Sequence, residues 1–288
     1  MMVGMDSNGG RVAHLTHDGL RFEAVLGGDP AGEPVVLLHG FPQDASAWDG
    51  VAGLLHQEGL RTLAPHQRGY LPGAAPTQVS AYRLEALVGD VLAWLDDQDL
   101  ARAHVVGHDW GGAVAWALAA WHPERVSTLT VLSTSHPAAL AWAVRHGDQA
   151  RRSWYIAGFQ VPRLPELALA RMLRRGGLAR TGLPAADGKR YAARLPDAAS
   201  LRGPVNWYRA AAARGGRRVG AVGVPTAYLW GARDPFLGRA AAERTEAHVS
   251  GDYRFVELQA GHWLLETRAD EVAAAVLGAV RGRGHRGH

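Results

Sequence analysis

Two aspartates and a histidine stand in glycine-containing motifs, in an order that suits nucleophilic catalysis. Asp109 lies in residues 107–112 (GHDWGG), Asp234 in residues 230–235 (WGARDP) and His262 in residues 260–263 (AGHW). A carboxylate can attack an electrophilic carbon and form an ester, and a histidine held by a second carboxylate can activate the water that cleaves it. We therefore expect Asp109 to act as nucleophile, His262 as base and Asp234 as the group that orients the histidine.

The GHDWGG motif fits a sharp turn from a strand into a helix. Its pattern is that of the G-x-S-x-G nucleophile elbow, with Asp109 in the place of serine. Glycines on both sides of the nucleophile allow a tight turn and close packing of the strand on the helix. Taken alone, the hexapeptide also fits an aspartate N-cap on an ordinary strand–helix turn.

A fourth motif, residues 39–42 (HGFP), follows another predicted strand and can complete the site. The backbone N–H groups of Phe41 and Trp110 are the expected donors of an oxyanion hole. The predicted substrate-binding side chains are His39, Pro42, Trp110, Phe159 and Trp263.

The elements that must position these residues alternate between strands and helices. Apolar, β-rich segments predict strands at 35–40, 61–65, 103–108, 126–134, 224–230 and 253–258. Helical spacing predicts helices at 46–58, 82–98, 110–121, 237–248 and 263–280. This alternation is typical of an α/β fold with a mostly parallel sheet covered by helices on both faces. The motifs follow strand ends, so they are expected to converge on the carboxyl edge of the sheet.

Charge is distributed unevenly along the chain. The 288 residues carry a formal net charge of +4, yet residues 145–220 contain 16 basic and 4 acidic side chains, a local charge of +12, which leaves −8 for the rest. This basic block is helical in pattern and interrupts the strand–helix alternation, which predicts an inserted helical unit. It contains no nucleic-acid-binding module, so we expect a solvated basic surface and no nucleic-acid partner.

Composition excludes several classes of protein. The chain has no cysteine, which excludes disulfides, thiolate metal sites and a thiol nucleophile. Hydrophobic residues make up 47% and charged residues 20%, as in ordinary globular domains. No apolar run reaches the roughly 18 residues of a membrane helix, and the N-terminus does not resemble a signal peptide. We therefore expect a cytoplasmic protein with no membrane partner.

The four motifs, in this order and across nearly the whole chain, resemble those of the α/β-hydrolase superfamily. The resemblance implies an α/β-hydrolase fold with an inserted α-helical cap. The expected catalytic domain is residues 1–136 and 221–280, the cap is residues 137–220, and residues 281–288 form a disordered basic tail. With an aspartate at the elbow, the chain resembles the branches of this superfamily that form an alkyl-enzyme ester: epoxide hydrolases, haloalkane dehalogenases and fluoroacetate dehalogenases.

Two tyrosines in the predicted cap favour the epoxide hydrolase branch. Residues 153–162 (SWYIAGFQVP) and 206–209 (NWYR) resemble the two segments that carry the family's cap tyrosines, here Tyr155 and Tyr208. Tyr191, also in the predicted cap, is the alternative cap tyrosine if the alignment of either segment with the family is shifted. The resemblance implies hydrolysis of an epoxide to a vicinal diol through an ester on Asp109, with the two tyrosines as acids. It implies a small-molecule epoxide substrate, no metal or organic cofactor, and a monomer or homodimer.

Alternatives remain open at this stage. A haloalkane dehalogenase would use the same Asp-His-Asp set, but Phe41 stands where such enzymes usually add a second halide donor. A non-enzymatic ligand-binding protein of this fold would not need the complete set. His66 departs from the aspartate usual at its position in relatives, and His108 and His136 are expected to be structural or pocket-lining. The basic cap could also attract an anionic substrate.

Overall fold

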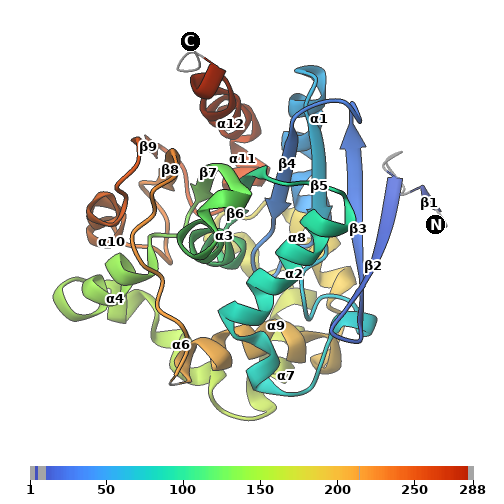
Figure 1. Cartoon of the computed structure of the whole chain (residues 1–288). Helices are drawn as coiled ribbons and strands as arrows, with labels where there is room; N and C mark the ends of the chain where they lie inside the picture. Colours follow the sequence, from blue (N-terminus) through green and yellow to red (C-terminus); the bar gives the residue numbers. More distant parts are fainter. Residues whose placement is uncertain (1–3, 6–10, 214, 285–288) are drawn as a thin grey trace.

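The computed structural model describes residues 4–5, 11–213 and 215–284. Strands of this described part form one sheet with the order β1-β2-β3-β5-β4-β6-β7-β8-β9 (Figure 1). The strands are β1 (Gly4–Met5), β2 (Arg11–His17), β3 (Leu20–Gly28), β4 (Pro34–Leu38), β5 (Arg61–Pro65), β6 (Ala103–His108), β7 (Val126–Leu132), β8 (Thr226–Gly231) and β9 (Tyr253–Leu258). Strands β4 to β9 pair in parallel, and β1, β2 and β3 add an antiparallel edge. The predicted mostly parallel sheet is confirmed.

Continuous apolar sequence explains the central strands. Every residue of β6, β7 and β8 is buried, as expected for parallel strands covered on both faces. The antiparallel β2–β3 hairpin was not among the predicted strands. Its residues alternate in burial and carry charges, and the tight turn at Asp18 and Gly19, both with positive φ, joins the two strands.

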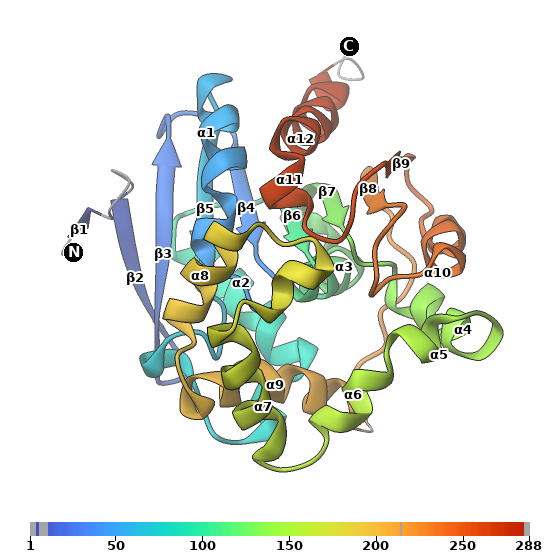
Figure 2. The ribbon, with the colours of Figure 1, turned by 180° about the vertical axis from the view of Figure 1, so that it is seen from behind.

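Helices cover both faces of the sheet. The outer elements are α1 (Asp49–Gln57), α2 (Leu84–Asp97), α3 (Trp110–Trp121), α10 (Arg239–Arg244), α11 (Leu264–Thr267) and α12 (Ala269–Gly284). Short 3-10 turns are η1 (Ala45–Trp48), η2 (Pro72–Ala74), η3 (Val79–Tyr82), η4 (Pro123–Arg125) and η6 (Thr245–His248). One apolar cluster joins α2 and α3 to the sheet, and a second joins α1, α11 and α12 to the opposite face (Figure 2).

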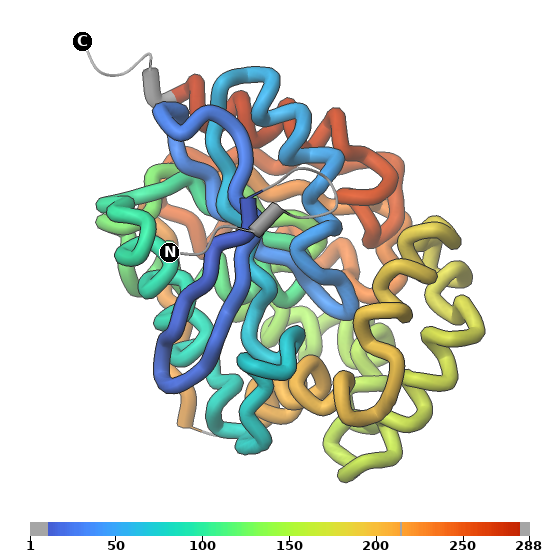
Figure 3. The backbone as a smooth tube through the Cα atoms, turned by 90° about the vertical axis from the view of Figure 1, so that its right-hand side faces the viewer, coloured from blue at the N-terminus to red at the C-terminus, as the bar shows by residue number. Residues whose placement is uncertain are grey.

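The segment between β7 and β8 is helical, and we call residues 137–220 the cap. It contains α4 (Pro137–His146), α5 (Gln149–Arg152), α6 (Trp154–Phe159), α7 (Leu164–Arg174), η5 (Gly177–Thr181), α8 (Ala185–Arg194) and α9 (Ala198–Ala212). Helices α7 and α8 lie on one side of the molecule, away from the β2–β3 hairpin (Figure 3). Their buried residues, such as Leu173 and Tyr191, belong to the same apolar cluster as α1 and α12.

Helix α9 contacts the loop that follows β5. The Trp207 indole N–H donates to the Arg68 carbonyl at 2.9 Å. A Cβ on Gly203 would lie 2.5 Å from Cα and the carbonyl oxygen of Gly69, so the two backbones meet directly. This backbone contact fixes the helix that carries Tyr208.

The C-terminal helix departs from its predicted bounds. The predicted helix 263–280 is divided into α11 and α12, and α12 continues to Gly284. Residues 281–284 are therefore helical, and the expected disordered tail does not begin at Arg281. The remaining part of that tail, residues 285–288, lies outside the described residues. Across the described ranges, none of the helices combines the length and the apolar character that a bilayer crossing requires.

Candidate active site

Asp109 occupies a strained turn between β6 and α3. Its backbone has φ 49° and ψ −120°, a region that non-glycine residues rarely adopt. A side chain on Gly107 would collide with the backbone of Gly111, so only glycine permits this approach. The Asp109 side chain makes no N-cap hydrogen bond to α3. The alternative of an ordinary N-cap is therefore wrong.

Backbone N–H groups hold the Asp109 carboxylate. The Phe41 N–H donates to Oδ1 at 2.9 Å, and the Trp110 N–H also donates to this carboxylate. A Cβ on Gly40 would collide with the Asp109 side chain, so this position has no room for one. Burial raises the pKa of Asp109, while the charge of His262 and the two N–H donors oppose that rise.

His262 lies between the two aspartates. Its Nδ1 is 2.8 Å from Asp234 Oδ2, and its Nε2 is 3.6 Å from Asp109 Oδ2. Asp234 Oδ1 accepts the N–H groups of Phe236 and Leu237 at 2.7 and 3.0 Å, so this carboxylate is fixed. Burial alone would lower the pKa of His262, but the charge and hydrogen bond of Asp234, together with Asp109, raise it above its usual value.

A cavity of about 280 Å³ opens over the carboxylate of Asp109. Trp110 from α3, Tyr155 from α6 and Tyr208 from α9 line it. The Tyr155 and Tyr208 ring centroids lie 6.2 Å apart, and the Trp110 ring packs edge-on against Tyr208 with centroids 4.8 Å apart. Burial, with the nearby charge of Asp109, raises the pKa of both tyrosines, so their hydroxyls stay protonated at neutral pH.

Two of the predicted substrate-binding residues in the HGFP motif do not line this cavity. His39 is fully buried, and its Nε2 accepts the Gln67 N–H at 3.2 Å. Pro42 is also buried, beside the Phe41 N–H donor. Both residues instead lie buried in the loop that carries Phe41, and neither is among the residues that line the cavity.

Phe159 and Trp263 also lie behind the cavity wall. The Phe159 ring packs edge-on against Tyr208 with centroids 4.8 Å apart. The Trp263 indole donates to Thr181 Oγ1 at 2.9 Å, and its ring packs on His262. Both support residues of the site without lining the cavity.

A buried hydrogen-bond network behind His262 was missed by sequence analysis. The His108 Nε2 is 3.0 Å from the His262 carbonyl, and its Nδ1 is 2.8 Å from Gln43 Oε1. Gln43 Nε2 donates to Glu266 Oε1 at 2.8 Å, and the Tyr191 hydroxyl donates to the same oxygen at 2.7 Å. Tyr191 is thus not a substitute for either cavity tyrosine. The position of Gln43 directly after HGFP was the signal available in the sequence.

The other two histidines also have structural surroundings. His66 is buried, its backbone N–H donates to the Glu23 carbonyl, and burial lowers the pKa of its imidazole. His136 Nδ1 accepts the Ala138 N–H at 3.2 Å and caps α4. Neither histidine lines the cavity, so the structural expectation for His136 holds and the pocket-lining one does not.

Gln149 and Ser153 line the cavity and were not predicted as site residues. Gln149 Nε2 donates to Ser153 Oγ at 2.8 Å, while Gln149 Oε1 accepts the Gly238 N–H at 2.9 Å. This pair connects the α5–α6 segment to the loop that carries Asp234. Their i, i+4 spacing just before Tyr155 was the available signal.

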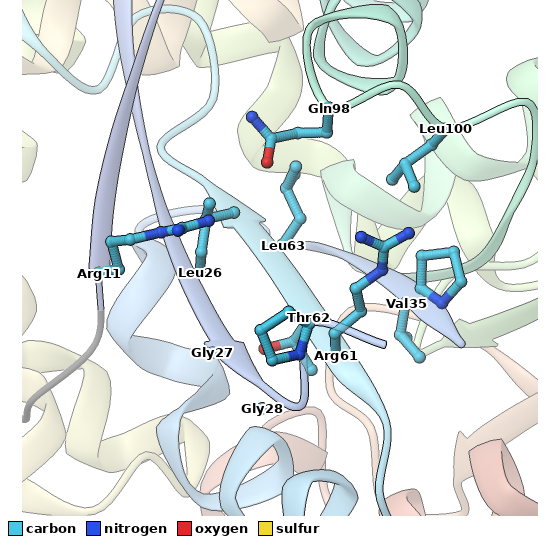
Figure 4. Close-up of a pocket in the computed structure, with 12 residues that line it drawn as sticks. Arg11, Leu26, Gly27, Gly28, Val35, Arg61, Thr62, Leu63, Gln98 and Leu100 are labelled. Atoms are coloured by element: carbon cyan, nitrogen blue, oxygen red, sulfur yellow. The ribbon is translucent and has the colours of Figure 1, made fainter. Parts of the chain in front are cut away.

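A second cavity, of about 320 Å³, lies at the opposite edge of the sheet (Figure 4). Arg11, Gly28, Val35 and Arg61 are among the residues that line it, at the ends of β3 and the starts of β2, β4 and β5. None of the predicted site residues contributes to it. Among the residues that the structure describes, no group of three or more His, Asp or Glu side chains is arranged to hold a metal ion.

Comparisons with known proteins agree with this fold. A family model described as the alpha/beta hydrolase fold matches residues 33–269. The chain is 33% identical to Epoxide hydrolase A of Mycobacterium tuberculosis (strain ATCC 25618 / H37Rv), over 90% of this chain and 94% of that protein. It is 32% identical to the AB hydrolase superfamily protein YfhM of Bacillus subtilis (strain 168), over 89% and 93%. The crystal structure of Epoxide Hydrolase A from Mycobacterium thermoresistibile is similar, with a TM-score of 0.77, 29% identity, and coverage of 94% of this chain and 98% of that chain.

Proposed function

The chain belongs to the epoxide hydrolase branch of the α/β-hydrolase family, and from this membership we propose that it converts an epoxide and water into a vicinal diol. One observation carries the proposal: a carboxylate, Asp109, and two protonated phenols, Tyr155 and Tyr208, line the same cavity. An epoxide needs a nucleophile at carbon and an acid at oxygen. This cavity offers both.

In the first step, an Asp109 oxygen attacks an epoxide carbon and the carbon–oxygen bond of the ring breaks. Tyr155 and Tyr208 hydrogen bond to the ring oxygen and one of them supplies its proton, so no free alkoxide leaves. The product is an ester between Asp109 and a hydroxyalkyl group. A positioned acid of this kind contributes about 10²–10⁴-fold to the rate.

In the second step, neutral His262 takes a proton from water, and the resulting hydroxide attacks the ester carbonyl carbon of Asp109. The oxyanion forms on a carboxyl oxygen that already accepts the Phe41 and Trp110 N–H groups, which stabilise it. The tetrahedral intermediate then collapses, its bond to the alkyl oxygen breaks, and that oxygen takes the proton from His262 and leaves as the diol. The proton of the added hydroxyl group passes to the phenolate left by the first step, which restores the Asp109 carboxylate. The cycle uses no metal or organic cofactor.

The charge of Asp109 links the two steps. The Asp109 carboxylate helps to raise the pKa of His262 in the free enzyme. Ester formation removes that negative charge, and the pKa of His262 then falls. The histidine therefore becomes a free base when a base is needed, in the ester intermediate.

The cavity supports epoxide opening over dehalogenation. The Trp110 indole, which a halide would require, packs edge-on against Tyr208 with ring centroids 4.8 Å apart. In the proposed reaction the Tyr208 phenol donates to the ring oxygen of the epoxide.

The proposal is tested by turnover of a panel of epoxides and chloroalkanes. We expect the wild-type protein to form diols and to release no halide. Tyr155→Phe or Tyr208→Phe should each reduce epoxide turnover, and the double variant should reduce it by about 10²–10⁴-fold. Tyr253→Phe is the matched control and should retain turnover, because the Tyr253 hydroxyl, on β9, has no hydrogen-bond partner among the described residues. Halide release that survives in the double variant would instead establish a dehalogenase.

A further inference from the structure

The apolar side chains that the protein exposes are concentrated in the cap. Of the five large hydrophobic residues that are strongly exposed in the described ranges, four lie between residues 154 and 167: Trp154, Val161, Leu164 and Leu167. Trp154 is 74% exposed and Leu164 is 65% exposed. Clusters of this kind mark interaction surfaces, whereas single exposed leucines need no explanation. We call residues 151–175 the α6–α7 corner.

Helix α7 has two distinct faces. Leu169, Ala170 and Leu173 are buried in the cap. Leu164, Leu167 and Arg171 follow each other at helical spacing on the exposed face. The leucines lie at the start of the helix beside the turn from α6, and the arginine follows toward its end. The exposed face of α7 is therefore apolar at its N-terminal end and basic toward its C-terminal end.

The exposed charged side chains of the corner are all basic. Exposed arginines are Arg151, Arg163, Arg171, Arg174 and Arg175. The acidic residue in this stretch, Glu166, is buried and pairs with Arg209 at 2.6 Å. Arg174 donates to the Pro196 carbonyl, and Arg151 is 4.0 Å from Asp148. For Arg163, Arg171 and Arg175 the described residues provide no carboxylate within ion-pair distance.

The corner also lies at an extremity of the molecule. The connection between α6 and α7 forms the end opposite the C-terminal helix in both ribbon views (Figures 1 and 2). A flat partner could therefore contact the corner without meeting the sheet or α12.

We infer that the α6–α7 corner docks on an anionic phospholipid surface. Trp154 and the leucines would enter the interface between headgroups and acyl chains, and the arginines would bind lipid phosphates. Phospholipid fits better than a protein partner because the corner combines an apolar tip with unpaired cations and exposes no carboxylate. Tyr155 and Ile156, next to Trp154 on α6, line the active-site cavity, so docking places this wall of the cavity beside the lipid. The inference does not depend on the proposed reaction.

The test is co-sedimentation of the full chain with unilamellar vesicles of phosphatidylcholine, alone or with about one third phosphatidylglycerol. The wild-type protein should bind the vesicles that contain phosphatidylglycerol, and high salt should release it, since the attraction is screened. Trp154→Ser/Leu164→Ser/Leu167→Ser and Arg163→Gln/Arg171→Gln/Arg175→Gln should each bind at least about tenfold more weakly. Val144→Ser/Arg145→Gln is the matched control, since both residues are exposed outside the corner, and it should bind as the wild type does.

Turnover in solution and thermal unfolding show that each variant is folded. Two results would overturn the inference: a wild-type protein that ignores anionic vesicles, or a triple serine variant that binds them equally well. A concentration-dependent dimer in the absence of lipid, lost in the serine variant by analytical ultracentrifugation, would also overturn it. In that case the corner joins two copies of the chain.

Discussion

At the scale of single residues, different surroundings give the carboxylates of Asp109 and Asp234 different roles. Asp109 is held by two backbone N–H groups and faces the cavity, whereas Asp234 is enclosed and accepts N–H groups from its own loop. The histidine between them hydrogen bonds to Asp234 at 2.8 Å and remains 3.6 Å from Asp109. Asp109 can therefore react with a molecule in the cavity, whereas Asp234 can only orient His262.

The pH dependence of ester hydrolysis should report the contact between His262 and Asp234. The base form of His262 is lost as the pH falls through its pKa, to which Asp234 still contributes in the ester, so activity should decline on the acid side. Asp234→Asn removes the charge that raises this pKa, and the acid limb should therefore move to lower pH. Turnover itself should fall by about 10³–10⁴-fold.

Pre-steady-state hydrolysis of the ester across a pH series measures this shift. Asp270→Asn, at an exposed carboxylate in the first turn of α12, is the control and should leave the limb in place. An acid limb that lies at the same pH in Asp234→Asn as in the wild type would show that the Asp234 carboxylate does not set the pKa of His262.

At the scale of elements, glycines set how closely backbones approach around the site. Gly107 and Gly111 permit the elbow between β6 and α3, and Gly203 permits α9 to touch the loop after β5. The elbow was predictable because its glycines flank a polar residue at a strand end. The contact of Gly203 with Gly69 was not, because nothing local in the sequence indicates which distant backbone a helical glycine will meet.

Gly203→Ala should destabilise the protein and loosen the cap. The added Cβ would lie 2.5 Å from Gly69 backbone atoms, and such overpacking typically costs about 1–3 kcal/mol. Gly188→Ala in α8 is the matched control, because its Cβ would be 3.6 Å from Leu183 Cδ2, an ordinary contact. Replacing glycine there should stabilise the helix by about 0.5–1 kcal/mol.

Urea unfolding of both variants checks this expectation, together with the Michaelis constant for the epoxide. If Gly203→Ala is as stable as Gly188→Ala, the α9 contact does not limit the docking of the cap.

At the scale of the whole molecule, the uneven charge of the chain coincides with its architecture. The basic block of residues 145–220 lies in the cap, and its arginines serve several separate contacts. Arg209 pairs with buried Glu166 inside the cap, and Arg194 reaches Asp44, which precedes η1 outside the cap, at 3.3 Å. Among the residues that the structure describes, no arginine or lysine lines the cavity. An attraction of anionic substrates by the cap is therefore not supported.

This arrangement predicts that salt has little effect on substrate binding. The Michaelis constant for a neutral epoxide should stay constant as ionic strength rises, because none of the described side chains that line the cavity is basic. An epoxide that carries a carboxylate should bind no better than its neutral analogue at low salt. Steady-state kinetics with the matched pair of substrates decide this, and a strong preference for the anion that salt removes would refute it.

Sequence reasoning succeeded where chemistry is local and failed where it depends on tertiary contacts. The motifs of Asp109 and Asp234 each include a strand end and that of His262 follows one closely, so their convergence followed from the topology of a parallel sheet. His39 and Trp263 were placed in the substrate pocket by proximity in sequence, but both rings point into packed surroundings. The Gln43–Glu266 hydrogen bond joins residues 223 positions apart, a pairing that one sequence cannot reveal.

The covalent role of Asp109 is the central claim, and intact-mass spectrometry of His262→Gln tests it most directly. This variant keeps the nucleophile but loses the base for ester hydrolysis, so incubation with an epoxide should add one substrate mass to the protein. The adduct should map to Asp109 and be absent in Asp109→Ala/His262→Gln. A folded His262→Gln protein that consumes epoxide without forming an adduct would contradict the account.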